Sequence, residues 1–264
     1  MRIPASEPRP WVASCTLLLF TSLPGIARLT QTAPPEGSSA PQTAEQVIDA
    51  YVSALGGKEA LAQITSRKAE GHLEMANRKE GHRKFTIYWR APDFSRMNLD
   101  SSDGALDIGF DGKAGWRSEH DGVNERLSKR SLELLLRDAN PLRYAHLAQL
   151  YPGVTLETEP PEGAPKGTAL VSRGPEETFR FYFDAQSHLL TQIVAESVKD
   201  EAGPRRYLFE DYRKVDGVFF PFAIREIVPL PNADPQAVHI ENILRFHKVQ
   251  NGISIPDSMF SPPR

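Results

Sequence analysis

The chain has 264 residues and a formal net charge of −3, and 40% of its residues are hydrophobic. This composition is ordinary for a soluble globular protein. The near-neutral balance gives no electrostatic reason to expect nucleic acid or an anionic membrane surface as a partner. The only cysteine is Cys15, within a predicted leader. The rest of the chain therefore holds no disulfide, thiolate zinc site or cysteine nucleophile.

Residues 1–27 have the three-part pattern of a secretory signal peptide. After a positively charged start, residues 11–23 form an uncharged apolar run, and Gly25 and Ala27 place small residues before a cleavage site. The run is shorter than the about 20 residues that a membrane-spanning helix needs. We therefore expect export to the bacterial periplasm. The alternative is lipidation at Cys15, which would leave the protein anchored to a membrane.

Residues 28–42 are rich in Pro, Ser, Thr, Gly and Gln. They cannot bury enough apolar surface to offset the entropy of ordering, so we predict a disordered linker. Thr43 then opens a helix, since a glutamine three residues later completes a capping box. Apolar residues follow at helical spacing as far as Leu55, where a Gly-Gly pair ends the helix. A short helix over 59–63 is predicted next.

From Ser66 onward the apolar residues change to a period of two, which is typical of half-buried antiparallel strands. The clearest alternation is over His82–Arg90, 95–100, 179–184 and 237–247. Asp-Gly and Asn-Gly dipeptides stand between the predicted strands, and they favour type I′ hairpin turns. These dipeptides are Asp103-Gly104, Asp111-Gly112, Asp121-Gly122, Asp216-Gly217 and Asn251-Gly252.

Two helical patterns interrupt the strands, over 131–136 and 140–150. Asn140 followed by Pro141 is a typical start, an N-cap and then proline at the first helical position. Helices on one face of a wide antiparallel sheet make an α+β fold. We predict a single domain over 43–264, with a strongly curved sheet of about 9–11 strands. Such a sheet leaves a concave apolar face that its own side chains do not fill.

The sequence contains none of the common catalytic or nucleotide-binding motifs. His72 and Glu74 share a strand face and could form half of a metal site, but a solvated surface pair is the preferred interpretation. We expect no metal, no cofactor and no enzyme activity. The carboxylates between Glu210 and Asp216 could serve a hydrolase, although an ion-pair ladder between strands explains them more simply. Polar residues of the last strand also read as a solvated face: His239, Glu241 and Arg245.

Aromatic side chains are in excess on the alternating strand faces. Core packing explains any single one, but three short helices can cover only part of so wide a sheet. The remainder predicts a concave, mostly apolar cavity, which is typical of a ligand site. The predicted lining is Phe85, Ile87, Trp89, Met97, Leu99, Trp116, Phe179, Phe181 and Phe183 from strands, with Leu135 and Leu142 from the mid-chain helices.

Four segments together resemble the LolA/LolB-like superfamily, bacterial envelope proteins of the outer-membrane lipoprotein-carrier type. They are 44–61, Gly109-Phe110-Asp111-Gly112-Lys113 with Gly115-Trp116, Tyr182-Phe183-Asp184 with Leu189-Leu190, and Asp211-Tyr212-Arg213 through Pro221-Phe222. Their order covers nearly all of 43–262. The resemblance implies an unclosed half-barrel sheet whose helices form a lid over a hydrophobic cavity.

The resemblance further implies a monomeric carrier or binding protein for a lipid or the acyl chains of a lipoprotein. No position matches the carrier's functional cavity arginine, so binding of an apolar ligand is better supported than lipoprotein trafficking. The alternative is a non-catalytic structural module that docks its sheet on an envelope protein partner.

Overall fold

The computed structural model describes residues 43–75, 82–100, 105–118, 124–198, 203–230 and 239–263. The predicted leader, linker and Cys15 lie outside these residues. The elements in chain order are α1 (Ala44–Leu55), α2 (Lys58–Gln63), β1 (Ser66–Met75), β2 (His82–Arg90), β3 (Phe94–Leu99), β4 (Leu106–Phe110), β5 (Gly115–Ser118), β6 (Asn124–Arg126), α3 (Lys129–Ala139), the 3-10 helix η1 (Pro141–His146), α4 (Leu147–Leu150), β7 (Thr155–Leu156), β8 (Thr168–Arg173), β9 (Glu177–Phe183), β10 (Leu190–Ser197), β11 (Arg205–Val215), β12 (Val218–Pro229), β13 (His239–Asn251) and the 3-10 helix η2 (Asp257–Phe260). Within the described ranges, no helix is long and apolar enough to cross a membrane.

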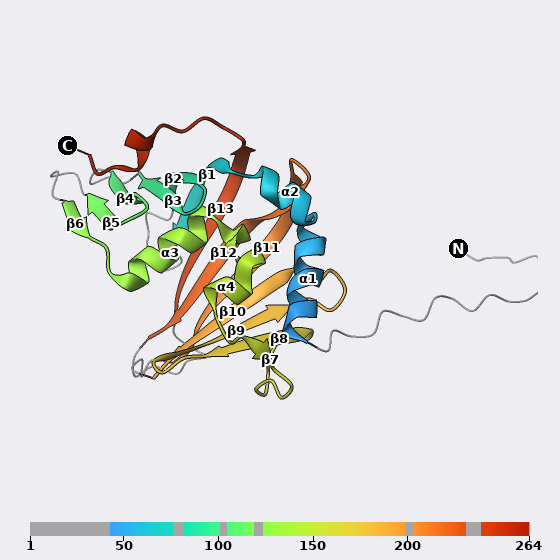
Figure 1. Cartoon of the computed structure of the whole chain (residues 1–264). Coiled ribbons are helices and arrows are strands. Elements are labelled where there is room, and N and C mark those ends of the chain that lie inside the picture. The colour runs from blue at the N-terminus through green and yellow to red at the C-terminus, as the bar shows by residue number, and fades with distance from the viewer. Residues whose placement is uncertain are drawn as a thin grey trace, which may run out of the picture. The chain divides into compact units, whose positions relative to one another are not determined.

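The thirteen strands of the described residues form one antiparallel sheet in the order β6-β5-β4-β3-β2-β1-β13-β12-β11-β10-β9-β8-β7. The first and last strands of the domain, β1 and β13, pair side by side in the middle of the order. The sheet is curved and does not close, because β6 and β7 are its two free edges (Figure 1). The predicted number of about 9–11 strands was too low. The edge strands have only three and two residues, too few for an alternating pattern to appear.

The helices α1, α3 and α4 lie against one face of the sheet (Figure 1). We call this the inner face and the opposite one the outer face. Helix α1 and η1 contact β12, while α3 contacts β2, β3 and β4. The segment that carries α3, η1 and α4 connects β6 to β7, so it runs from one edge of the sheet to the other across the inner face. The predicted α+β fold, with helices over a curved unclosed sheet, is confirmed.

The predicted capping box of the first helix is present. The Thr43 hydroxyl oxygen accepts a hydrogen bond from the Gln46 backbone at 3.2 Å, and the Gln46 side chain accepts one from the Thr43 backbone at 3.1 Å. The helix ends before Gly56, whose φ of 132° is a backbone conformation that glycine adopts without the steric strain that other residues would have there. Its buried face is Val47, Tyr51, Val52 and Leu55, which packs on the inner face of the sheet.

The mid-chain helices differ from their predicted bounds. Helix α3 begins at Lys129, because the Ser128 side chain caps it by accepting from the Ser131 backbone at 3.1 Å. Pro141 opens a 3-10 helix, and the Asn140 side chain makes no cap hydrogen bond to it. Instead the Asn140 Oδ1 accepts from Arg67 Nη1 at 3.2 Å. Asn140 is thus the N-cap residue, with Pro141 at the first helical position as predicted, but its side chain bonds a tertiary partner and not its own helix.

Of the predicted two-residue hairpin turns, Asp216-Gly217 forms one, with φ values of 49° and 87° between β11 and β12. Asp111 makes a wider turn between β4 and β5, in which its carboxylate accepts from the backbone of Lys113 and Ala114. Asn251 ends β13 and leads into no hairpin. The Asp103-Gly104 and Asp121-Gly122 turns lie outside the described residues.

Candidate ligand site between the mid-chain helices and the sheet

Most of the predicted lining residues come together on the inner face. Phe85 and Ile87 of β2 pair with Leu99 and Met97 of β3, so their side chains share one face. Six other predicted lining residues belong to the same core cluster: Trp89, Leu135, Leu142, Phe179, Phe181 and Phe183. Phe179 is half-buried, and the other five are buried. The aromatic strand faces thus form a packed core beneath the helices.

Trp116 does not belong to this face. It is paired with Gly109, which is in turn paired with Arg96 of β3. Because successive residues of a strand point to opposite faces, Trp116 lies on the outer face, away from Met97. Its Nε1 donates to the Phe260 carbonyl at 2.8 Å, beneath the C-terminal segment. The prediction that Trp116 lines the concave face was wrong, because a short strand carries too little pattern to assign its face.

A pocket of about 440 Å³ opens between α3, the end of α4 and strands β9, β10 and β11. We call it the α3 pocket. Its volume lies within the range of small-molecule sites, about 300–1,000 Å³. Its wall combines apolar and aromatic side chains with charged ones: Leu134, Tyr144, Tyr151, Phe179, Ile193, Ala195 and Tyr207, then Lys129, Arg130, Glu133, Arg137, Glu176, Glu177, Ser197 and Arg205. Phe179 is the one predicted lining residue among them.

Arg137 is the buried charge of the α3 pocket, with only 4% of its surface exposed. Its Nε and Nη2 both donate to the Asp138 carboxylate, at 2.7 and 2.6 Å. The guanidinium carbon lies 4.2 Å from the centre of the Tyr207 ring, a cation–π contact. Among the described residues, no partner accepts a hydrogen bond from Nη1. A buried donor without an acceptor is rare and costly.

The carboxyl of Asp138 and two tyrosine hydroxyls of the pocket have raised pKa values. Burial raises the pKa of Asp138 above its ordinary value, and the charge of Arg137 limits the rise. Burial also raises the pKa of Tyr144 to about 12 and the pKa of Tyr151 further still. Both phenols are therefore neutral at physiological pH, which keeps this wall of the pocket largely apolar.

A second pocket, of about 390 Å³, lies on the other side of η1 and α4. We call it the α2 pocket. It is lined by Ile64 after α2, by Trp89 of β2, and by Leu142 and Arg143 of η1, among others. Trp89 Nε1 and Arg143 Nε also have no hydrogen-bond partner among the described residues. Two of the predicted lining residues, Trp89 and Leu142, thus face this pocket.

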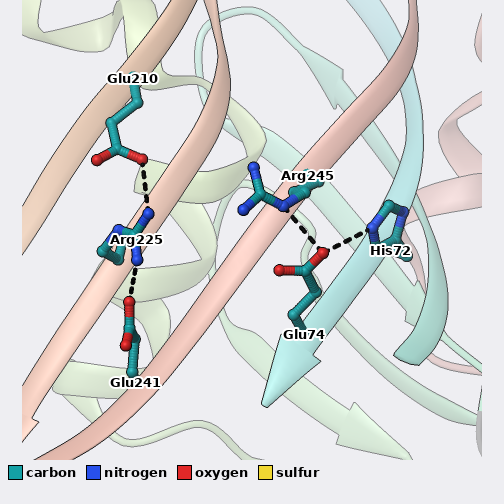
Figure 2. Close-up of polar contacts among 6 residues, drawn as sticks. All are labelled: His72, Glu74, Glu210, Arg225, Glu241 and Arg245. Carbon is teal, nitrogen blue, oxygen red and sulfur yellow. Dashed lines mark hydrogen bonds and ion pairs between the residues drawn. The ribbon is translucent and has the colours of Figure 1, made fainter. Parts of the chain in front are cut away.

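The carboxylates considered for a hydrolase are held by ion pairs and hydrogen bonds on or near the outer face. Figure 2 shows Arg225 between Glu210 and Glu241, with Nη2 of Arg225 3.2 Å from the Glu210 carboxylate. Asp211 pairs with Arg213 at 2.6 Å, and Asp216 accepts from the Asn251 side chain at 3.1 Å. The Glu210–Arg225–Glu241 contacts cross from β11 to β12 and β13, as in the cross-strand ladder that the sequence favoured, whereas Asp211 pairs within its own strand and Asp216 with an amide.

Comparison with known proteins bears on the fold. No protein-family model and no curated protein matches the chain. The structure is similar to that of a LolA superfamily protein from Nitrosomonas europaea, with a TM-score of 0.54 and 12% sequence identity, over 83% of this chain and 97% of that one. The chain has the LolA-type fold. An outer membrane lipoprotein-sorting protein domain from Vibrio parahaemolyticus is less similar, with a TM-score of 0.49 and 9% identity over 77% of this chain and 93% of that one.

Sequence reasoning missed most of the α3 pocket. A LolA-type sheet lets helix residues face the core, but the sequence places Arg137 next to Asp138, an arrangement that usually marks a solvated helix surface. Nothing in the pattern of α3 indicates that this pair is buried. Tyr144 of η1 and Tyr151 after α4 both line the pocket; they are seven residues apart, the spacing of one face of a continuous helix, and that spacing could have identified them.

Proposed function

We propose that this protein is an exported, non-enzymatic carrier or binding protein for a hydrophobic ligand, a lipid or the acyl chains of a lipoprotein. The observation that carries the proposal is the α3 pocket, an opening of about 440 Å³ between the mid-chain helices and the inner face of a LolA-type sheet. The apolar and aromatic part of its wall suits an acyl chain, because apolar surface removed from water contributes roughly 25 cal/mol per Å².

Arg137 supplies the polar contact that orients the ligand. Its charge is already balanced by Asp138, at 2.6 Å, so Nη1 needs a hydrogen-bond acceptor more than a second anion. A carbonyl oxygen at the head of an acyl chain is such an acceptor, whether it belongs to an acid or an ester. A hydrogen bond from a charged donor is worth about 1.5–3 kcal/mol, enough to favour acyl compounds over plain hydrocarbons.

The lid segment, η1 and α4, lies between the α3 pocket and the α2 pocket, since it contributes residues to both walls. If this segment moves away from the sheet, the two pockets join into one groove along the inner face. The joined groove holds a longer or a second acyl chain. This is the part that we expect to move when a ligand enters.

Binding of a fluorescent fatty acid to the exported protein tests the proposal. We expect saturable binding of a dansyl-labelled undecanoic acid to delipidated protein, and co-purified lipid in the mass spectrum of the untreated protein. The absence of both would refute the carrier function. A stable stoichiometric complex with an envelope protein, formed without any lipid binding, would instead support the docking alternative.

Displacement of the probe tests the role of Arg137. Dodecanoic acid and its methyl ester should displace it, while dodecane should do so roughly tenfold less well. In Arg137→Lys, which keeps a cation beside Asp138, the preference for acid and ester over alkane should disappear. If the variant keeps the preference, Arg137 does not contact the carbonyl. If acid and alkane bind the native protein equally, the head group is not recognised at all.

Export and oligomeric state follow from the same proposal. We expect the protein in the periplasmic fraction, with an N-terminus at residue 28 if the leader is cleaved, or with acyl groups on Cys15 if it is anchored. We also expect a monomer, because the free edges β6 and β7 are very short and short edges resist edge-to-edge pairing. Light scattering coupled to size exclusion measures the mass, and a concentration-independent dimer would contradict this.

A further inference from the structure

Three side chains on the outer face form a cluster that ligand binding does not use. His72 and Glu74 come from β1 and His82 from β2, where Glu74 and His82 are cross-strand partners. The Nε2 of His72 lies 3.1 Å from Oε1 of Glu74, and Figure 2 shows the two side chains pointing toward each other. One ligand atom from each of the three residues lies within 4.8 Å of the others.

These residue types and distances suit a transition-metal ion. Imidazole nitrogen and carboxylate oxygen are the usual ligands of Zn²⁺, at about 2.0–2.2 Å. Two ligand atoms on one tetrahedral zinc ion are therefore roughly 3.4 Å apart, close to the 3.1 Å between His72 and Glu74. His82 is exposed, so rotation of its ring brings the third ligand atom closer. The geometry points to a Zn²⁺ site formed by His72, Glu74 and His82, with water at the fourth position.

Arg245 is the neighbour that orients the carboxylate. Its Nε donates to Oε1 of Glu74 at 2.9 Å, the same oxygen that contacts His72 (Figure 2). Such outer partners are usual around metal-binding carboxylates and fix their direction. Burial by itself raises the pKa of Glu74, but the hydrogen bonds from Arg245 and His72 lower it overall.

Two cations oppose the ion and set how tightly it binds. Arg245 is one, and Lys84, the cross-strand partner of His72, is the other. Their repulsion weakens the binding of any divalent ion, and the two imidazole ligands favour Zn²⁺ over Ca²⁺ or Mg²⁺, which prefer sites built from oxygen ligands. The site therefore discriminates by ligand type, and it joins β1 to β2 at the end of that strand pair.

Zinc titration of the exported protein, prepared without a polyhistidine tag, tests the site. Calorimetry at pH 7.4 should give one Zn²⁺ per chain, with a higher melting temperature in zinc and no effect of Mg²⁺. His72→Ala and His82→Ala should each weaken binding at least roughly tenfold. Both side chains are at the surface, so circular dichroism should show the folded structure retained in both variants.

The matched control removes a histidine elsewhere. His188 lies in the turn between β9 and β10 with a φ of 56°, a conformation that asparagine tolerates. His188→Asn should bind zinc as the native protein does. No binding by the native protein, equal binding by His72→Ala and His82→Ala, or equal loss in His188→Asn would each overturn the site. None of these outcomes affects the acyl-binding proposal.

Discussion

At the scale of single residues, the most unusual group is Arg67, which is 1% exposed in the core. Its Nε donates to Asn251 at 2.9 Å and its Nη1 to Asn140 at 3.2 Å. The guanidinium lies over the ring of Phe220 at 4.5 Å. Its hydrogen-bond partners are amides, and among the residues that the structure describes no carboxylate pairs with it. Burial lowers the pKa of Arg67 to about 9. Planar stacking and two amide acceptors take the place of a counter-ion.

Substitution of Arg67 should separate its charge from its shape. Arg67→Lys keeps a buried cation but loses the stacking and the forked hydrogen bonds, so it should cost about 3–5 kcal/mol. Arg67→Met removes the charge and fills most of the volume, so it should cost less than the lysine variant. Urea unfolding measures both. A lysine variant as stable as the native protein would show that this charge is hydrated.

At the scale of elements, a bulge in β13 fixes how the two ends of the domain meet. Glu70 pairs with Lys248 and Gly71 with Phe246, so His247 is the extra residue of β13. The register with β13 shifts between Glu70 and Gly71. A Cβ on Gly71 would lie 2.1 Å from the Arg245 carbonyl oxygen and 2.4 Å from the ring of Phe85. The close approach of β1 and β13 at the middle of the sheet therefore requires glycine at this position.

Gly71→Ala should thus be strongly destabilising, by about 2–4 kcal/mol, since backbone and core must both move. Gly217→Ala is the comparison. Gly217 has a φ of 87° but open space around its Cβ position, so only backbone strain of about 1 kcal/mol applies. Thermal unfolding of the two variants shows which substitution lowers the stability more. Equal losses would mean that the sheet adjusts at the bulge.

The lid segment makes a prediction at the same scale. Trp89 lines the α2 pocket, whereas Trp116 lies on the outer face, so Trp116→Phe leaves Trp89 as the reporter of the inner face once the leader with Trp11 is removed. A brominated fatty acid that occupies the joined groove should quench this fluorescence strongly. Quenching no greater than that by free bromide would mean that the ligand stays in the α3 pocket and the lid does not move.

At the scale of the whole molecule, ionised carboxylates stabilise the fold at neutral pH. Backbone and side-chain donors lower the pKa values of several of them, foremost the Ala114 backbone for Asp111, the Ser187 backbone for Asp184 and the Arg213 side chain for Asp211. A carboxyl pKa that is lower in the folded state adds stability above the ordinary value, near 4, and that stability is lost as the pH falls through the folded pKa.

The melting temperature should therefore fall steadily from about pH 5 to pH 2. Asp184→Asn should lower it at pH 7, and the difference should shrink as the pH falls through the lowered pKa of Asp184 and the native carboxyl becomes protonated as well. Differential scanning calorimetry across this range measures the effect. A melting temperature that does not change with pH in the native protein would show that these hydrogen bonds are equally strong to the protonated carboxyl groups. Asp138, whose pKa burial raises, acts in the opposite direction and softens the slope.

The sequence by itself determined the local structure, because that depends on residues close together in the chain. Neighbouring residues determine the capping box at Thr43, the alternation over β2 and β9 and the turn at Asp216-Gly217. Together these features predicted an α+β fold with a curved sheet. The four segments that resemble the LolA/LolB-like superfamily indicated the fold that the comparison with solved structures then bore out.

Only the tertiary structure decided which face each side chain occupies and which polar groups meet. Trp116 falls on the outer face through the register of three strands, and the side chain of the N-cap residue Asn140 accepts from Arg67, 73 residues away, and not from its own helix. Arg137 is buried because the segment that carries α3, η1 and α4 crosses the inner face of the sheet, and the residue pattern of α3 does not indicate that crossing. Hydrogen bonds and burial between distant segments are set by packing, so the pocket and the cluster of His72, Glu74 and His82 form only when the chain is folded.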